Sequence, residues 1–321
     1  MFMRVLYTCI ALTACALPAS AVELKCREVK IVAPFPAGNG TDVVARIIAP
    51  RIAARIGRNV IIENRPGAFG QIGASAVAKA EPNGCTIGIL NVGPLILLPS
   101  EFRARGETPP YEPDDFTPIV MTHQIYNVLV VADSIPVRTL PEFAAYARAH
   151  PNLGVTSGFP FGSFVWKVLR SHYRIELNEI PAKAGGEVAA LTSILAGDVP
   201  VGLFAPIVAL PHIDSGKLRP LAIFGSGEFP PMSYVPNVKT LGIPEFKTVD
   251  LWGGLFGPKN LPGDIRETLS RATLEALNEP ETIKGISGVG FKAQPGTGAA
   301  LGRIMKEQYP AWIKVMQKTG S

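Results

Sequence analysis

The stretch from Val29 to Gly73 constrains the fold of this chain more than any other. A short apolar run, Val29–Ala33, ends in a turn rich in proline and glycine, and a long segment with apolar residues at the helical period follows it. Gly57 suits the position after the last helical residue, and a second apolar run covers Val60–Ile62. This order predicts a strand, a helix and a second strand that is parallel to the first and joined to it by a right-handed crossover.

Two glycine-containing loops, Phe35–Asp42 and Arg65–Gly73, follow the two predicted strands, and each precedes a predicted helix. Ligands of such sheets bind outside the carboxyl ends of the strands. Free backbone N–H groups and the positive end of a helix dipole meet there, so the loops are predicted to bind an anion. The alternative for the first loop is a tight turn in which Thr41 or Asp42 merely caps the helix.

A dinucleotide-binding fold is the main competing interpretation of this unit. Gly38 and Gly40 follow a strand, and Glu63 ends the next strand, where a ribose-binding acid belongs. The third glycine of that motif is missing, because Val43 stands in its place, and Asp42 in the first helical turn would repel a pyrophosphate. This interpretation is therefore rejected, and no cofactor is expected.

Three motifs, in order along the chain, resemble a known family. PFPAGNGTDVVAR, ENRPGAFGQIGA and PNGCTIGI are similar to the PFPAGGGTD, ENRPGAGGNIG and PDGYT sequences of the periplasmic receptors of tripartite tricarboxylate transporters, the Bug-type solute-binding proteins. The likeness covers nearly the whole mature chain and is strongest in its first third. It implies an α/β periplasmic-binding-protein fold of two domains around a ligand cleft. It also implies a receptor that captures a small organic carboxylate for membrane permease subunits.

Export is predicted from the first 21 residues. Arg4 precedes an apolar run, and Ala19-Ser20-Ala21 is a cleavage site of the small-x-small type, which together indicate a signal peptide over residues 1–21. A lipoprotein signal ending at Cys15 is the competing interpretation, and it would attach lipid to that residue. Both place the mature protein outside the cytoplasm, and the resemblance implies the periplasm.

The remaining chain of about 300 residues is longer than one core usually spans, which predicts two domains. Strands and helices alternate from about residue 126 to 248, and Asp250–Gly257 resembles the strand with which the family returns to its first domain. We therefore expect a discontinuous first domain of residues 22–125 and 250–321 and a second domain of residues 126–249. Two chain crossings would form a hinge of the kind that closes around ligands.

Other elements are predicted from periodicity and from turn residues. In the first domain we expect a helix around Gln71–Ala80, a strand at Thr86–Leu90, a surface loop over 99–118, and helices at about 262–278 and 297–317. Ile125–Val131 is predicted to be a strand that leaves this domain, and the strand order 2-1-3 is expected around the opening unit. In that order Cys26 and Cys85 would lie at the same sheet edge, within reach of a disulfide.

The resemblance implies that a carboxylate is held between the two glycine loops. The candidate ligand-binding residues of the first domain are Phe35, Ala37, Gly38, Asn39, Gly40, Thr41, Asp42, Gly67, Phe69, Gly70 and Gln71, with Asn91 after the third strand. Arg65 could be mistaken for a carboxylate clamp, but a structural ion pair with Glu63 is at least as good an interpretation.

The second domain departs from the family pattern. Its candidate residues are Thr156, Ser157, Gly158 and Ser163, which match a strand-to-helix loop of the family, together with Phe159, Phe161 and Ala182. Ser163 as a simple helix cap is the alternative. Ala182 replaces a tyrosine of the family and Pro200 an acid, while the two phenylalanines are gained. These changes predict a monocarboxylate with a bulky or aromatic body. The alternative is that both phenylalanines pack into the domain and the ligand is an ordinary dicarboxylate.

Other functions have little support. The chain has no G-x-S-x-G elbow, no HExxH or Cys-x-x-Cys spacing and no Walker A motif, so neither an enzyme nor a metal site is expected. The net charge of +5 is spread thinly, which makes nucleic acid a poor ligand. A monomer is expected. The alternative to transport is an exported sensor that reports ligand occupancy to a membrane kinase.

Overall fold

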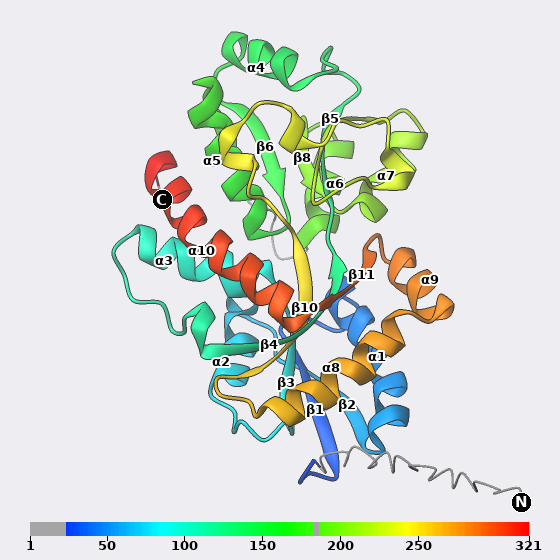
Figure 1. Cartoon of the computed structure of the whole chain (residues 1–321). Coiled ribbons are helices and arrows are strands. Elements are labelled where there is room, and N and C mark those ends of the chain that lie inside the picture. Colours follow the sequence, from blue (N-terminus) through cyan, green and yellow to red (C-terminus); the bar gives the residue numbers. More distant parts are fainter. Residues whose placement is uncertain (1–23, 181, 183–185, 321) are drawn as a thin grey trace, which may run out of the picture.

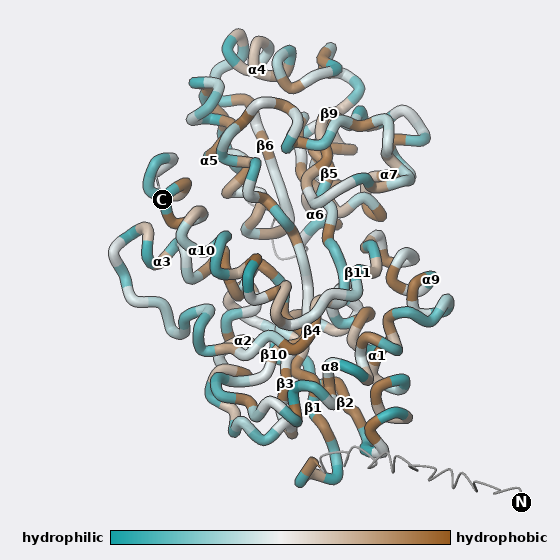
Figure 2. Tube along the Cα trace, in the orientation of Figure 1, coloured by the Kyte–Doolittle hydropathy of each residue, from teal (hydrophilic) through white to brown (hydrophobic). Residues whose placement is uncertain are grey.

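The computed structural model describes residues 24–180, 182 and 186–320 (Figure 1). The predicted signal peptide and Cys15 lie outside the described residues. The described chain forms two β-sheets, and helices pack around each of them. Figure 2 shows the apolar residues concentrated on the strands and the polar ones on the outer helices.

The first sheet has six strands in the order β11-β4-β10-β3-β1-β2. Its strands are β1 (Glu28–Ala33), β2 (Asn59–Asn64), β3 (Thr86–Asn91), β4 (Phe116–Gln124), β10 (Trp252–Pro258) and β11 (Lys292–Thr297). The helices around it are α1 (Gly40–Ile56), α2 (Gln71–Ala78), α3 (Leu98–Ala104), α8 (Gly263–Leu277), α9 (Pro280–Gly288) and α10 (Gly298–Thr319). β1 is parallel to β2 and β3, whereas β10 is antiparallel to β3 and β4.

The second sheet has five strands in the order β7-β6-β8-β5-β9. Its strands are β5 (Asn127–Ala132), β6 (Leu153–Ser157), β7 (Leu177–Glu179), β8 (Val201–Phe204) and β9 (Leu218–Phe224). The helices around it are α4 (Leu140–Ala149), α5 (Pro160–Tyr173), α6 (Gly186–Leu195) and α7 (Pro206–Asp214). β6 is parallel to β7 and β8, and β5 is antiparallel to β8 and β9.

The opening strand–helix–strand unit forms as its sequence predicts. The Asn39 side chain accepts a hydrogen bond from the Thr41 N–H at 3.0 Å and caps α1, so the alternative in which Thr41 or Asp42 caps the helix is wrong. Gly57 ends the helix in the left-handed conformation, with φ 65°, and its N–H donates to the Ala53 carbonyl. β1 and β2 then pair in parallel register. The two loops after these strands therefore lie at one edge of the sheet.

Two chain segments connect the sheets, and they touch each other. One lies between β4 and β5, and the other leads into β10. The Ile125 N–H of the first donates to the Leu251 carbonyl of the second at 2.8 Å. The division into domains at about residues 125 and 250 remains a prediction, because α10 also packs on both parts: it lies against β4, α3 and α5. Its Trp312 stacks on Phe164 of α5, with ring centroids 4.9 Å apart.

Several predicted elements are wrong. The expected surface loop over 99–118 contains helix α3 and the beginning of β4, and the strand predicted from Ile125 begins at Asn127. β4 was missed because Pro118 interrupts its apolar run. β11 was missed because its KAQPGT sequence carries proline and glycine and pairs on one side only, at the sheet edge. The α7, α9 and β7 segments were not predicted either.

A disulfide joins Cys26 to Cys85, with their Cα atoms 5.8 Å apart. It lies at the amino edge of two paired strands, since the Lys30 N–H donates to the Cys85 carbonyl at 2.8 Å. The strand order 2-1-3 that suggested this pairing is present. The bridge therefore ties the segment before β1 to the segment before β3.

We predict that this disulfide contributes about 4 kcal/mol to the free energy of unfolding, because it closes a long loop in the unfolded chain. Thiol titration of the denatured protein without residues 1–21 should find no free thiol before reduction and two after it. The C26S/C85S variant should unfold at correspondingly lower denaturant concentration. Two free thiols in the unreduced protein would contradict this prediction.

Candidate functional site

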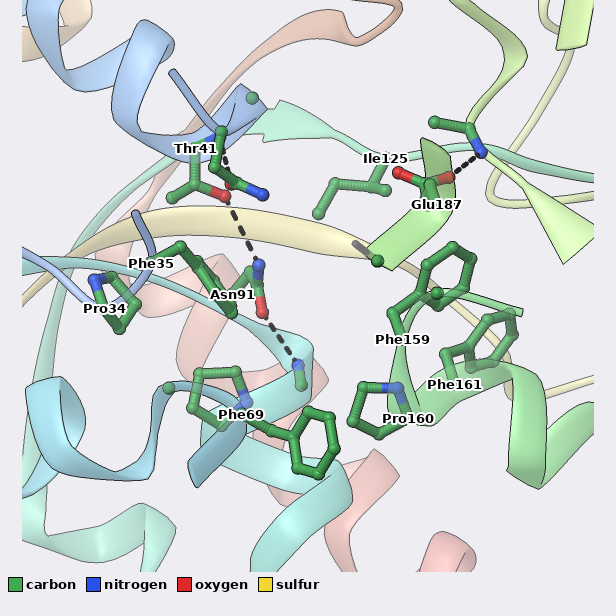
Figure 3. A pocket seen from close by; sticks show the side chains of 18 of the residues that line it. Pro34, Phe35, Thr41, Phe69, Asn91, Ile125, Phe159, Pro160, Phe161 and Glu187 are labelled. Carbon is green, nitrogen blue, oxygen red and sulfur yellow. Dashed lines mark hydrogen bonds between the residues drawn. The ribbon is translucent and has the colours of Figure 1, made fainter. Parts of the chain in front are cut away.

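A cavity of about 680 Å³ lies between the two sheets and is the candidate binding site. This volume is within the range of sites for small molecules. Both glycine loops of the first sheet border it, and the second sheet contributes the starts of α5, α6 and α7 (Figure 3). The carboxyl ends of β1, β2, β6 and β8 lead into the two glycine loops and the starts of α5 and α7, as expected for a ligand site in an α/β protein.

The carboxylate of Asp42 fixes the conformation of the first loop from the side away from the cavity. This carboxylate is fully buried and accepts hydrogen bonds from the Gly38 N–H at 2.8 Å, from Asn64 Nδ2 at 2.8 Å and from Arg46 Nε at 2.9 Å. Burial by itself would raise the pKa of Asp42, but these hydrogen bonds and the charge of Arg46 lower it below its ordinary value. Asp42 does not line the cavity, so its predicted contact with ligand is replaced by a role in positioning the loop.

The amides of the first loop are less free than predicted. The Gly38 N–H is bonded to Asp42, the Asn39 N–H to the Pro36 carbonyl at 3.2 Å, and the Thr41 N–H to the Asn39 side chain. Among the described residues, no partner accepts the Gly40 N–H. The Gly40 N–H and the Thr41 hydroxyl are therefore the groups of this loop that can donate hydrogen bonds to a carboxylate. The Thr41 hydroxyl lies 3.4 Å from Asn91 Nδ2.

The second loop carries backbone strain. Gly67, Ala68, Phe69 and Gly70 have φ values of 126°, 44°, 54° and 94°. For Ala68 and Phe69 this left-handed conformation costs roughly 1–2 kcal/mol each, and such strain tends to gather at ligand sites. Phe69 is 64% exposed and borders the cavity (Figure 3).

Arg65 is not a carboxylate clamp. Its Nε lies 2.5 Å from Glu63 Oε1, and the other oxygen of Glu63 lies 2.9 Å from Lys30 Nζ. The guanidinium is thus engaged at the end of β2, and Arg65 does not line the cavity. This is the structural ion pair that the sequence suggested.

Three hydroxyl groups of the second half bond to protein instead of lining the cavity. Thr156 Oγ1 donates to the Ile180 carbonyl at 2.8 Å, Ser157 Oγ to the Phe159 carbonyl at 3.2 Å, and Ser163 Oγ to Glu179. Ser163 is also not the cap of α5, since Phe159 occupies that position. These hydroxyls stabilise the loop and leave its surface toward the cavity apolar.

Twelve of the nineteen candidate ligand-binding residues line the cavity, and seven do not. Those that line it are Phe35, Gly38, Asn39, Gly40, Thr41, Gly67, Phe69, Gly70, Asn91, Gly158, Phe159 and Phe161. Those that do not are Ala37, Asp42, Gln71, Thr156, Ser157, Ser163 and Ala182.

Four lining residues of consequence were not predicted from the sequence: Asn127, Glu187, Phe291 and Trp312. Asn127 begins β5 directly after the first crossing, and Glu187 stands in the first turn of α6. Their positions at the start of a strand and of a helix could have identified them from the sequence. Phe291 lies against Gly40, where an added Cβ would come within 2.7 Å of its ring. The two aromatic residues come from the carboxyl-terminal part, which was expected in the first domain, but local pattern does not show that these side chains reach the cavity.

The sequence model of the tripartite tricarboxylate transporter family receptor matches residues 44–321. The chain belongs to this family. It is 29% identical to protein BugT of Bordetella pertussis over 322 residues, covering 97% of this chain and 95% of BugT. The family consists of solute-binding receptors, so the chain is a receptor and not an enzyme.

Solved structures support the same assignment. The periplasmic binding protein BugD superposes with a TM-score of 0.73 at 25% identity, covering 92% of this chain and 98% of BugD. MatC from Rhodopseudomonas palustris with bound malate gives 0.74 at 28% identity, covering 90% and 98%. The predicted periplasmic-binding-protein fold is thereby confirmed. In the described part of the chain, no helix has the length and apolar character needed to cross a membrane.

We predict that Asp42→Asn lowers the free energy of unfolding by about 2 kcal/mol at pH 7, because an amide cannot accept all three hydrogen bonds that the carboxylate accepts. Because the pKa of Asp42 is lowered in the folded state, the charged carboxylate contributes its full stabilisation above the ordinary pKa of 3.8. This stabilisation is lost as the pH falls through the lowered pKa. The difference between wild type and variant should therefore be full at pH 7 and smaller at pH 3 in urea unfolding. Asp114→Asn, at an exposed acid, is the matched control; an equal loss there would refute the assignment.

Proposed function

We propose that this receptor captures a small organic carboxylate in the cavity between its sheets and delivers it to membrane permease subunits of a tripartite transporter. The observation that supports this proposal best is the cavity itself, because the two glycine loops that resemble those of the family meet the second sheet there. MatC, with malate bound, shows that a relative holds a carboxylate. Family membership favours transport over the sensor alternative.

Export by a signal peptide over residues 1–21, a soluble periplasmic form in place of lipid attachment at Cys15, and a monomeric state complete the proposal. The small-x-small site at Ala19-Ser20-Ala21 supports cleavage. Intact-mass measurement of the protein from the periplasm would show whether cleavage occurs after residue 21.

We further propose that the ligand has an apolar or aromatic body. Aromatic side chains surround the cavity: Phe35, Phe69, Phe159, Phe161, Phe291 and Trp312. No Lys, Arg or His is among the described residues that line it, so a second carboxylate would find no cationic partner there. An unpaired charge in such a place is costly, whereas each aromatic contact adds roughly 0.5–1.5 kcal/mol beyond area burial.

The two phenylalanines of the second half serve different purposes. Phe161 is 7% exposed and packs among Phe164, Phe224 and Trp312, with ring centroids 5.7, 5.7 and 6.3 Å away. Phe159 is only partly buried and caps the start of α5 beside the cavity. The alternative that both phenylalanines pack into the protein thus describes Phe161 well, while Phe159 remains the candidate for contact with ligand.

Calorimetric titration against a panel tests the proposal. Aromatic monocarboxylates such as 4-methylbenzoate should bind, and citrate, malate and succinate should bind more weakly. Phe159→Ala should weaken the preferred ligand about 2- to 10-fold with little change in thermal stability. Phe161→Ala should lower the free energy of unfolding by about 3–5 kcal/mol. Tight binding of the small polycarboxylates with no binding of aromatic acids would overturn the proposed ligand class.

A further inference from the structure

The cavity contains one charged side chain among the described residues that line it, and that charge is negative. Glu187 stands in the first turn of α6, and its Oε1 accepts a hydrogen bond from the Ala205 N–H, just before α7, at 2.6 Å. Figure 3 shows its other oxygen facing the cavity. Among the described residues, no group donates a hydrogen bond to that second oxygen. One oxygen is thus fixed by the protein, and the other is available to a ligand.

Asn127 supplies a second polar group beside Glu187. It is 6% exposed and lines the cavity, and its side-chain amide makes no hydrogen bond within the described chain. Val128 pairs with Phe204 across β5 and β8, so Asn127 lies next to Ala205, the residue that bonds to Glu187. Because Asn127 lines the cavity and its side chain bonds to no described residue, its amide is available to a ligand there. Its oxygen can accept from a ligand as the free oxygen of Glu187 can.

The backbone around Glu187 fixes its place. Gly158, at the end of β6, lies so close to α6 that an added Cβ would come within 2.2 Å of the Glu187 N atom. The starts of α5, α6 and α7 therefore meet at this point. The positive ends of three helix dipoles would suit an anion. The protein's own carboxylate, however, already occupies the position.

Burial raises the pKa of Glu187, and the hydrogen bond from Ala205 offsets this only in part. A carboxylate in this position therefore lacks a full set of partners when the cavity is empty. A second carboxylate on the ligand would increase the repulsion, whereas a donor group would reduce it.

We propose that Glu187 and Asn127 form a subsite for a hydrogen-bond donor, above all an ammonium group, at the end of the ligand remote from its carboxylate. The inference rests on the proposed function, because the first sheet must hold the carboxylate for the second group to reach this subsite. The ligand class is then a zwitterion with an apolar or aromatic body, and simple dicarboxylates are excluded by charge. This subsite sets specificity by repelling the wrong ligand as well as by attracting the right one.

Three para-substituted benzoates that differ only in the distal group test the subsite: 4-(aminomethyl)benzoate, 4-methylbenzoate and terephthalate. A second series on a four-methylene spacer, 5-aminopentanoate, hexanoate and adipate, separates the effect of the distal group from that of the aromatic body. In calorimetric titration of the wild type, the ammonium ligand of at least one series should bind about 10- to 100-fold more tightly than its dicarboxylate.

Glu187→Gln is the decisive variant, because glutamine can keep the hydrogen bond from Ala205 while turning a donor toward the cavity. The preference for ammonium over dicarboxylate should fall at least tenfold in this variant. Glu176→Gln is the matched control: it makes the same charge change at an exposed residue of the second half, outside the cavity, and should leave the preference unchanged. Thermal unfolding of both variants verifies that they are folded. Asn127→Ala, which breaks no hydrogen bond within the described chain, should also weaken the ammonium ligand.

The outcomes separate the two proposals. A wild type that prefers the dicarboxylate in both series, or a preference that Glu187→Gln leaves unchanged, would overturn the donor subsite and leave carboxylate capture standing. Failure of every carboxylate in both series to bind would overturn the proposed function and the subsite with it. If Glu176→Gln reduced the preference for ammonium over dicarboxylate as much as Glu187→Gln does, the effect would come from net charge. That result would also overturn the subsite.

Discussion

The ligand-facing wall of the first sheet depends on the buried carboxylate of Asp42. This group connects three elements: the loop after β1 through the Gly38 N–H, the end of β2 through Asn64, and α1 through Arg46. Asn64 Nδ2 also donates to the Phe35 carbonyl at 3.0 Å, so the same side chain orients the start of the loop. A carboxylate that accepts several hydrogen bonds can remain charged in the interior, and its three partners leave the loop little freedom.

The second sheet provides the opposite wall through different chemistry. Gly158 allows α6 to approach, Phe159 and Phe161 make the start of α5 apolar, and the hydroxyls of Thr156 and Ser157 bond to main-chain carbonyls. The two walls are connected by the adjacent crossing segments and by α10, which packs on both parts. Any change in the separation of the walls must therefore move Trp312 relative to Phe164, a stacked pair in the core. The predicted closure of two domains would therefore be coupled to the packing of the last helix.

Local sequence was sufficient for the opening unit and insufficient for the directions of side chains. Gly57, the capping side chain of Asn39 and the apolar runs on both sides determine β1, α1 and β2 by local rules, and the cysteine pairing followed from strand order. The hydroxyl of Thr156, in contrast, lies at the end of the correct strand but donates to the carbonyl of Ile180, the residue directly after β7, a strand that was not predicted.

Tertiary contacts decide the rest of the site. An aspartate in the first helical turn, such as Asp42, can cap the helix or contact a ligand. Only its hydrogen bond with Asn64, 22 residues later, shows that its carboxylate points into the protein interior. Phe291 and Trp312 come from the carboxyl-terminal part of the chain and reach the cavity because β11 and α10 return to the first sheet. A loop motif can therefore predict where a ligand lies without predicting which side chains touch it.

The two walls together make the cavity electrostatically asymmetric. The first offers a backbone amide at Gly40, the Thr41 hydroxyl and the start of a long helix, all of which favour a carboxylate. The second offers Glu187 and the Asn127 oxygen, which favour a donor. An apolar cavity strengthens both preferences, because charges are screened less there than in water. A ligand with opposite charges at its two ends satisfies both walls in one orientation only, and reversing it would place like charges together at Glu187. The same asymmetry that selects the ligand class therefore also fixes the direction in which the ligand lies.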